Sequence, residues 1–375
     1  MRRRTLLSAG ILCLLFLPLL YAEVKNRDRP AKGEWDLNPE KVWQVDRAGD
    51  DVFGLPFTLR SRKEGSLFIY DLKNDVNYIF DAEGTFIRKF APGGQGPGEI
   101  GGQGRTFLVD DKVIISGANA FHYFTREGDY LRTARLEGAN LPAHLFLNED
   151  ELIAAPLTGF HTPDGRGKIL LRNLRLGSET VLAEFSSFEG GVGRSGEQVF
   201  DMIVVGLSPL LTIGQDRDRI CWGLSDAYLI HVTDLEGKPI NAFSVNRKPT
   251  KISDRVKRGY FKNPNLPADV LGQIVDSFPD ALTFFHRIEW HNGLIYVFVP
   301  ELDLEVGRPR IRQIDIFSPE GEYLYRAKIE LEKGLRPVFS PLDNLIISGN
   351  FLYAACEKED DTVVIVKYHI DLPGR

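Results

Sequence analysis

The sequence is poor in cysteine and methionine, and it lacks the short motifs that mark most metal and nucleotide sites. Of its 375 residues, three are Cys and two are Met, whereas 36 are Gly. No histidines have the His-x-x-x-His spacing and no cysteines the Cys-x-x-Cys spacing that many zinc sites use. No Gly-Lys-Ser/Thr follows a glycine-rich stretch and no Gly-x-Ser-x-Gly is present, which excludes a P-loop and the common serine-hydrolase turn. The composition favours an all-β, turn-rich protein.

The first 22 residues have the layout of a secretory signal peptide. Three arginines, Arg2–Arg4, precede an apolar run that ends at Ala22, so cleavage before Glu23 is expected. The alternative is an uncleaved membrane anchor, because the run is close to the roughly 17 residues that the shortest membrane span needs. Cleavage would change the formal net charge from −6 to −9. We therefore expect export to the periplasm or the extracellular space, no membrane span in the mature chain, and a partner other than nucleic acid.

A pattern of two apolar runs around a Glu-Gly or similar turn recurs along the chain. Glycine suits such hairpin turns because it accepts a positive φ without a side-chain clash. The turn glycines are Gly84, Gly128, Gly177, Gly237 and Gly321. Their first two spacings, 44 and 49 residues, fit a four-stranded propeller blade of roughly 40–50 residues. The later spacings fit a blade with insertions.

Six predicted starts of innermost strands give a six-bladed, all-β propeller of four-stranded antiparallel blades. Four of the starts carry a Pro before an apolar run, and proline is tolerated at the first residue of a strand. The starts lie near residues 56, 105, 142, 209, 285 and 337. Because the last copy supplies only about three strands, we expect the N-terminal strand Val42–Val45 to close the last blade. Cys221 and Cys356 then fall in non-adjacent blades and are expected to be free thiols.

The resulting domain plan has four parts. Residues 1–22 are the signal peptide, 23–40 a mobile lead-in, and 41–375 the propeller, with a helical insertion at about 247–284 between blades 4 and 5. Within the insertion, Ser253–Phe261 and Pro267–Phe278 are predicted to be short helices. The apolar stripe of the second helix either packs on the propeller body or forms a lid over one face.

Residues 68–100, FIYDLKNDVNYIFDAEGTFIRKFAPGGQGPGEI, resemble an NHL-type repeat. The whole chain resembles the bacterial six-bladed β-propeller family that is related to NHL-repeat proteins. The family pattern Asp-x-x-Asn before the third strand is matched by Asp71 and Asn74, and the other blades lack it. The resemblance implies the fold and no single activity, although related six-bladed enzymes bind a metal in the central channel through His or carboxylate ligands.

Basic residues near the predicted starts of inner strands make up the candidate ligand site. Those strand ends surround the central channel, so the side chains are expected to meet at its mouth. The candidates are Arg105, His144, His286, Arg287 and Arg336. Two histidines with three arginines suit an anion better than a cation, and no cofactor is expected. The alternative is that each side chain satisfies a local need of the backbone or is simply solvated.

Two functions remain open at this point. The first is an exported, monomeric, non-catalytic binding protein that presents one propeller face to a protein, peptide or glycan, with an anionic ligand expected at the channel mouth. The second is a metal-dependent lyase or hydrolase with its site in the central channel. The absence of a catalytic motif favours the first, because this fold works by displaying loops and a channel.

Overall fold

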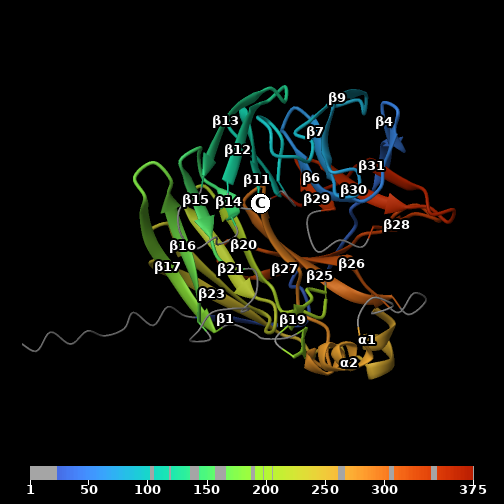
Figure 1. The fold of residues 1–375 in the computed structure, drawn as a ribbon. Helices are drawn as coiled ribbons and strands as arrows, with labels where there is room; N and C mark the ends of the chain where they lie inside the picture. The colour runs from blue at the N-terminus through green and yellow to red at the C-terminus, as the bar shows by residue number, and fades with distance from the viewer. Residues whose placement is uncertain are drawn as a thin grey trace, which may run out of the picture.

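The structure is a computed structural model that describes residues 23–101, 105–117, 120–135, 143–156, 166–186, 191–196, 198–204, 206–260, 267–303, 308–338 and 344–374. Within these ranges, six antiparallel sheets stand around a common axis, so the protein is a six-bladed β-propeller (Figure 1). In each blade the chain starts at the innermost strand and moves outward. The predicted fold class is confirmed.

The strands of the blades have the following bounds. Blade 1 contains β6 (Pro56–Ser61), β7 (Leu67–Asp71), β8 (Val76–Phe80) and β9 (Phe86–Phe90), and blade 2 contains β10 (Arg105–Val109), β11 (Lys112–Ser116), β12 (Ala120–Thr125) and β13 (Tyr130–Arg135). Blade 3 contains β14 (Ala143–Phe146), β15 (Glu151–Ala154), β16 (Arg166–Asn173) and β17 (Ser178–Ser186). Blade 4 contains β20 (Leu211–Asp216), β21 (Arg219–Leu224), β22 (Leu229–Asp234) and β23 (Pro239–Asn246). Blade 5 contains β24 (Arg287–His291), β25 (Leu294–Asp303), β26 (Arg308–Phe317) and β27 (Tyr323–Lys328).

Blade 6 is closed by the N-terminal part of the chain. Its inner strand is divided into β28 (Arg336–Pro337) and β29 (Leu345–Ser348), and both pair with β30 (Phe351–Glu357). The next strand, β31 (Val363–His369), pairs on its outer side with β3 (Glu40–Val45) in antiparallel register. The expected closure is therefore confirmed.

The apolar runs form strands that other blades cover on both faces. Every residue of β7 and β8 is buried, whereas most of the outer strand β13 is exposed. This gradient explains why the middle strands have continuous apolar sequences, since both of their faces lie against neighbouring blades. The two cysteines of the described chain, Cys221 and Cys356, are free and buried in blades 4 and 6.

Residues 23–35 are paired with two blades, which corrects the expectation of a mobile lead-in over 23–40. β1 (Glu23–Arg27) pairs in parallel with β23, and β2 (Glu34–Trp35) pairs in parallel with β27. Asn26 holds the first contact by donating hydrogen bonds to the carbonyl oxygens of Ser244 and Gly321. We call residues 23–35 the N-terminal strap. It covers the outer edges of blades 4 and 5, which would otherwise present unpaired backbone groups.

A buried ionic network lies beneath the strap. Asp315 on β26 is fully buried, and its Oδ2 atom lies 2.9 Å from Nη2 of Arg247, just beyond β23. Nε of Arg326 on β27 lies 3.6 Å from the other oxygen of Asp315. Oδ1 of Asp28 in the strap lies 2.6 Å from Nη2 of both arginines. The network therefore joins the strap, blade 4 and blade 5.

The hairpin glycines also determine how closely the blades pack. Gly321, with φ of +94°, carries no Cβ, and a Cβ at this position would lie 2.6 Å from Cβ of Phe243 on the outer strand of blade 4. In the same way, a Cβ at Gly84 would lie 2.8 Å from the ring of Trp43 on the outer strand of blade 6. Each turn therefore lies against the outer strand of the preceding blade, and only glycine satisfies both the turn and the contact.

Two insertions pack together beside the propeller. The predicted helices are present as α1 (Asp254–Tyr260) and α2 (Ala268–Ser277), and a hairpin of β18 (Val192–Ser195) and β19 (Gln198–Asp201) lies against α2. Backbone N–H groups of Gly191 and Val192 donate to Oγ of Ser277, at 2.7 and 3.1 Å. In Figure 1 this unit lies at the edge of the ring, beside β25 and β26. We call it the insertion unit.

Candidate functional site

A cavity of about 390 Å³ lies on the propeller axis, and residues from all six inner strands line it. Inner strands run in the same direction in every blade, so residues at their starts surround one mouth of the channel and residues at their ends surround the other. The lining spans both, from Arg105, His144 and Arg287 near strand starts to Arg60 and His291 near strand ends. The volume lies within the roughly 300–1,000 Å³ that is typical of small-molecule sites.

Three arginines reach this axial cavity from three different strands: Arg60 from β6, Arg105 from β10 and Arg287 from β24. The guanidinium of Arg287 donates to the carbonyl oxygen of Leu345 and lies 4.2 Å from the ring centroid of Phe298. The guanidinium of Arg105 lies 5.8 Å from the ring of Phe107. Stacking of this kind orients a guanidinium without using its N–H donors, which suits recognition of planar oxyanions.

His144 adds an imidazole from β14. Its side chain is almost fully buried, and its Nε2 lies 3.2 Å from the carbonyl oxygen of Ala155. A carbonyl oxygen can only accept, so this contact requires a proton on Nε2. The histidine is thereby oriented by Ala155, the residue after strand β15, and it lines the cavity.

Glu289 and His291 also line the cavity, and the sequence reasoning missed both. Side chains of a strand alternate in direction, so Arg287, Glu289 and His291 point the same way from β24. One carboxylate oxygen of Glu289 lies 2.7 Å from Nε of Arg287, and the other lies 2.7 Å from Nε2 of His291. The alternating Arg-x-Glu-x-His pattern at a predicted inner strand was the available signal.

Of the five predicted site residues, the structure brings Arg105, His144 and Arg287 together at one cavity. His286 and Arg336 do not line it. The backbone N–H of His286 donates to the carbonyl oxygen of Phe298 at 2.8 Å, and Arg336 is exposed in the short strand β28. Both lie at the starts of inner strands, as expected. The direction in which the side chain of such a first residue points depends on packing, which the sequence pattern does not specify.

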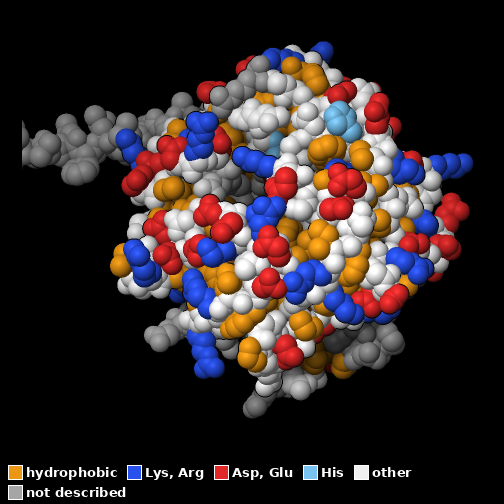
Figure 2. Space-filling view, turned by 90° about the horizontal axis from the view of Figure 1, so that it is seen from above, with side chains coloured by type: hydrophobic (Ala, Val, Ile, Leu, Met, Phe, Trp, Pro, Cys, Tyr) orange, Lys and Arg blue, Asp and Glu red, His pale blue; other side chains and the backbone are white. Residues whose placement is uncertain are grey.

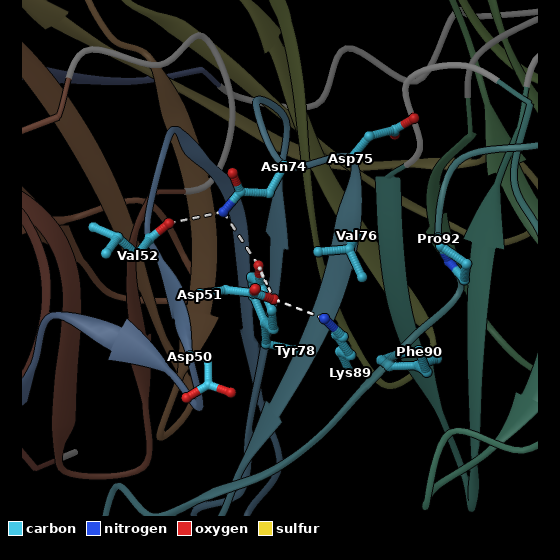
Figure 3. Close-up of a pocket in the computed structure, with 10 residues that line it drawn as sticks. All are labelled: Asp50, Asp51, Val52, Asn74, Asp75, Val76, Tyr78, Lys89, Phe90 and Pro92. Atoms are coloured by element: carbon cyan, nitrogen blue, oxygen red, sulfur yellow. Dashed lines mark hydrogen bonds and ion pairs between the residues drawn. The ribbon is translucent and has the colours of Figure 1, made fainter.

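A second recess, of about 600 Å³, lies over blade 1. Figure 3 shows its hydrogen-bonded wall, in which Asn74 Nδ2 donates to the carbonyl oxygen of Val52 at 2.8 Å and to the Tyr78 hydroxyl at 3.2 Å. That hydroxyl donates to Oδ2 of Asp51, which also accepts from Lys89 at 3.1 Å. Burial, together with the charge of Asp51, raises the pKa of Tyr78 to about 12.

The charges of this recess differ from those of the axial cavity. Asp50, Asp51 and Asp75 line it with one cation, Lys89, which is paired with Asp51. Asp71 and Asn74, the residues of the NHL-like pattern, have a structural part here: buried Asp71 accepts from the backbone N–H groups of residues 54, 55, 73 and 74. The recess does not suit an anion.

The face of the molecule that Figure 2 shows does not single out another site. Figure 2 shows acidic and basic side chains interspersed over one face, without a continuous area of one sign.

No residue of the insertion unit lines the axial cavity as it is described. The apolar stripe of α2 instead forms its own cluster, in which Val270, Ile274 and Val275 are fully buried. The packing interpretation of that stripe is thus supported, and the lid stays a hypothesis.

In the described parts of the chain, no group of three or more His, Cys, Asp or Glu side chains is arranged to hold a metal ion. The same parts contain no helix that is long and apolar enough to cross a membrane.

Comparison with known proteins gives similarity of fold. No protein-family model and no curated protein matches the chain. Among solved structures, a member of the DUF4221 family from Bacteroides vulgatus is 12% identical, with a TM-score of 0.57, over 90% of this chain and 99% of that one. A protein of Bacteroides fragilis named as a candidate exported protein is 14% identical, with a TM-score of 0.52, over 93% of this chain and 99% of that one. These similarities confirm the fold.

A calcium-binding protein, regucalcin from Agrobacterium tumefaciens, is also similar. It is 10% identical, with a TM-score of 0.46, over 92% of this chain and 97% of that one. We infer nothing about metal binding from a similarity of this size.

Proposed function

We propose that this protein is an exported, non-catalytic binding protein that holds an anionic ligand in its axial cavity. The observation that carries the proposal is the convergence of Arg60, Arg105 and Arg287 on one cavity. Among the lining residues described there, Glu289 is the one carboxylate. In a mature chain with an expected net charge of −9, such a local excess of positive charge attracts anions and orients them.

Export is supported by the arrangement of residues 1–22 and agrees with the description of the similar protein from Bacteroides fragilis. Cleavage of that segment, a monomeric state and the relation to NHL-repeat proteins are part of the same proposal. The competing function, a metal-dependent lyase or hydrolase, would need a ligand set for its metal, and the described residues supply no observation that favours one.

The test measures the binding of small anions to the mature protein and to two arginine variants. Inorganic phosphate, sulfate and D-glucuronate serve as probes in isothermal titration calorimetry. A hydrogen bond to a charged group contributes about 1.5–3 kcal/mol, so Arg105→Ala should weaken the binding of the best probe by roughly 10- to 100-fold. Arg336→Ala removes an exposed arginine outside the cavity and should change the affinity less than about twofold.

Equal losses of affinity in both variants would show that the effect comes from net charge rather than from the cavity. Binding that is unchanged in Arg105→Ala would place the anion site elsewhere. Melting temperatures of both variants, measured in the same buffers, separate loss of binding from loss of fold.

A further inference from the structure

We infer that the ligand of the axial cavity is a hydroxylated carboxylic acid of sugar size, such as a sugar acid, and that Glu289 selects for its hydroxyl groups. This inference rests on the proposed function, because it concerns the same cavity. It goes beyond anion binding by naming which second group the anion must carry.

The first step is the position of Glu289 inside an otherwise cationic cavity. Its side chain is 21% exposed, and Arg287 and His291, its partners at 2.7 Å, are 13% and 18% exposed. Arg287 and His291 lie on the same strand as Glu289, and each contacts one of its two carboxylate oxygens. The carboxylate is therefore a fixed part of the wall and does not move away when a ligand enters.

The second step is what a fixed carboxylate does to a bound anion. It repels negative charge, so an anion placed anywhere in the cavity binds less tightly than it would without Glu289. A carboxylate also accepts hydrogen bonds and cannot donate them. A ligand group next to Glu289 is therefore tolerated only if it carries an O–H or N–H donor. A ligand with an anionic end for the arginines and a donor-bearing body for Glu289 satisfies both requirements.

The third step distinguishes a hydroxyl from an ammonium donor. Arg60, Arg105 and Arg287 give the cavity three guanidinium groups against one carboxylate. A ligand ammonium would gain from one negative charge and be repelled by three positive ones, whereas a neutral hydroxyl is not repelled. Gln215 and Ser348 also line the cavity, and their side chains can exchange hydrogen bonds with hydroxyl groups.

The fourth step is size. A cavity of about 390 Å³ accommodates a ligand with the volume of a monosaccharide or somewhat larger. Simple oxyanions such as phosphate would leave most of it filled with water. A monosaccharide acid has its carboxylate and its hydroxyl groups on one compact ring, which matches the arrangement of arginines and Glu289 around one space.

The experiment compares three ring compounds of similar size by isothermal titration calorimetry with the mature protein. D-Glucuronate carries a carboxylate and hydroxyls, cyclohexanecarboxylate carries a carboxylate alone, and D-glucose carries hydroxyls alone. Glucuronate should bind at least about tenfold more tightly than either of the others, because it alone combines a carboxylate for the arginines with hydroxyl donors for Glu289, and hydrogen bonds to a charged acceptor are the stronger kind. In Glu289→Gln, both acids lose the same repulsion of their carboxylate, whereas glucuronate alone also loses the hydrogen bonds of its hydroxyls to a charged acceptor. Its preference over cyclohexanecarboxylate should therefore fall about tenfold.

Glu322→Gln, which removes an exposed carboxylate from a turn of blade 5, is the matched control and should leave the preference unchanged. Equal affinities of the unmodified protein for the two acids would overturn the inference while leaving anion binding in place. If phosphate, sulfate and all three ring compounds fail to bind, the proposed function itself is wrong. If Glu289→Gln loses its fold, the comparison of the two acids on the unmodified protein still decides the question.

Discussion

Replacement of Asp315 by Asn should lower the free energy of unfolding by about 3–5 kcal/mol, the range found when one partner of a buried ion pair is removed. Asp315 is fully buried, and its carboxylate is the shared partner of Arg247 and Arg326. The hydroxyls of Tyr228 and Tyr323 donate to it at 2.6 and 2.5 Å. An amide at this position would turn an N–H donor toward its neighbours, and the guanidinium groups among them can only donate. It would also leave Arg247 and Arg326 with the partly exposed Asp28 as their remaining carboxylate partner in this network.

The expected change in melting temperature follows from the size of the protein. With an unfolding entropy of about 2.1 cal/mol/K per residue, the loss corresponds to a Tm lower by roughly 4–7 °C for a chain of this length. Urea denaturation followed by tryptophan fluorescence gives the free energy, and calorimetry gives the Tm. Asp216→Asn is the matched control, because it breaks an Asp–Arg pair with side chains 24% and 28% exposed, which should contribute no more than about 1 kcal/mol. Equal effects of the two substitutions would refute the idea that the strap, blade 4 and blade 5 are joined through Asp315.

Two further predictions concern other parts of the same framework. Gly321→Ala should destabilise the protein by about 2–4 kcal/mol in urea denaturation, since the new Cβ would add left-handed strain to a clash with Phe243. Gly177→Ala has positive φ but nothing within 4 Å, so a loss of more than about 1–2 kcal/mol there would contradict the packing argument. Burial alone would raise the pKa of Asp28, but its hydrogen bonds and ion pairs with the two arginines outweigh burial and hold the pKa below its usual value. Its stabilising effect should therefore be present above about pH 4 and disappear as the pH falls through the folded-state pKa, and Asp28→Asn should remove that part of the acid dependence measured by denaturation at pH 3 to 6.

The sequence marks the hairpin turns by a second residue besides the glycine. Four of the hairpin turns begin with a short polar residue three positions before the glycine, namely Asp81, Thr125, Asp234 and Ser318. Each accepts a backbone N–H from the turn, as Asp81 does from residues 83 and 85 at 3.1 and 2.7 Å. Side-chain acceptors of this kind are a local device that stabilises turns. The repeated pattern of Asp, Thr or Ser followed by x-Glu-Gly would have located these turns from sequence.

The candidate site was only partly predictable. Arg105, His144 and Arg287 were found because strand starts can be read from sequence and every inner strand borders the axis. Glu289 and His291 lie two and four residues further along the same strand as Arg287, and only the three-dimensional arrangement shows that the cavity continues past them. His286 and Arg336 were correctly predicted to lie at the starts of inner strands, but they do not line the cavity. Packing decides which way the side chain of a first strand residue points.

The sequence by itself determined the number of blades, the starts of their inner strands to within about two residues, the closing strand and the two helices of the insertion. These features depend on local patterns: runs of β-branched and aromatic residues, glycine at turns with positive φ, and helical spacing of apolar residues. Only the tertiary structure decided the place of the N-terminal strap. Its residues are charged and show no apolar alternation, and their partners on β23 and β27 lie more than 200 residues away. Such parallel pairing is held by backbone hydrogen bonds and by single polar contacts such as those of Asn26 and Asp28, and no local pattern of residues encodes these.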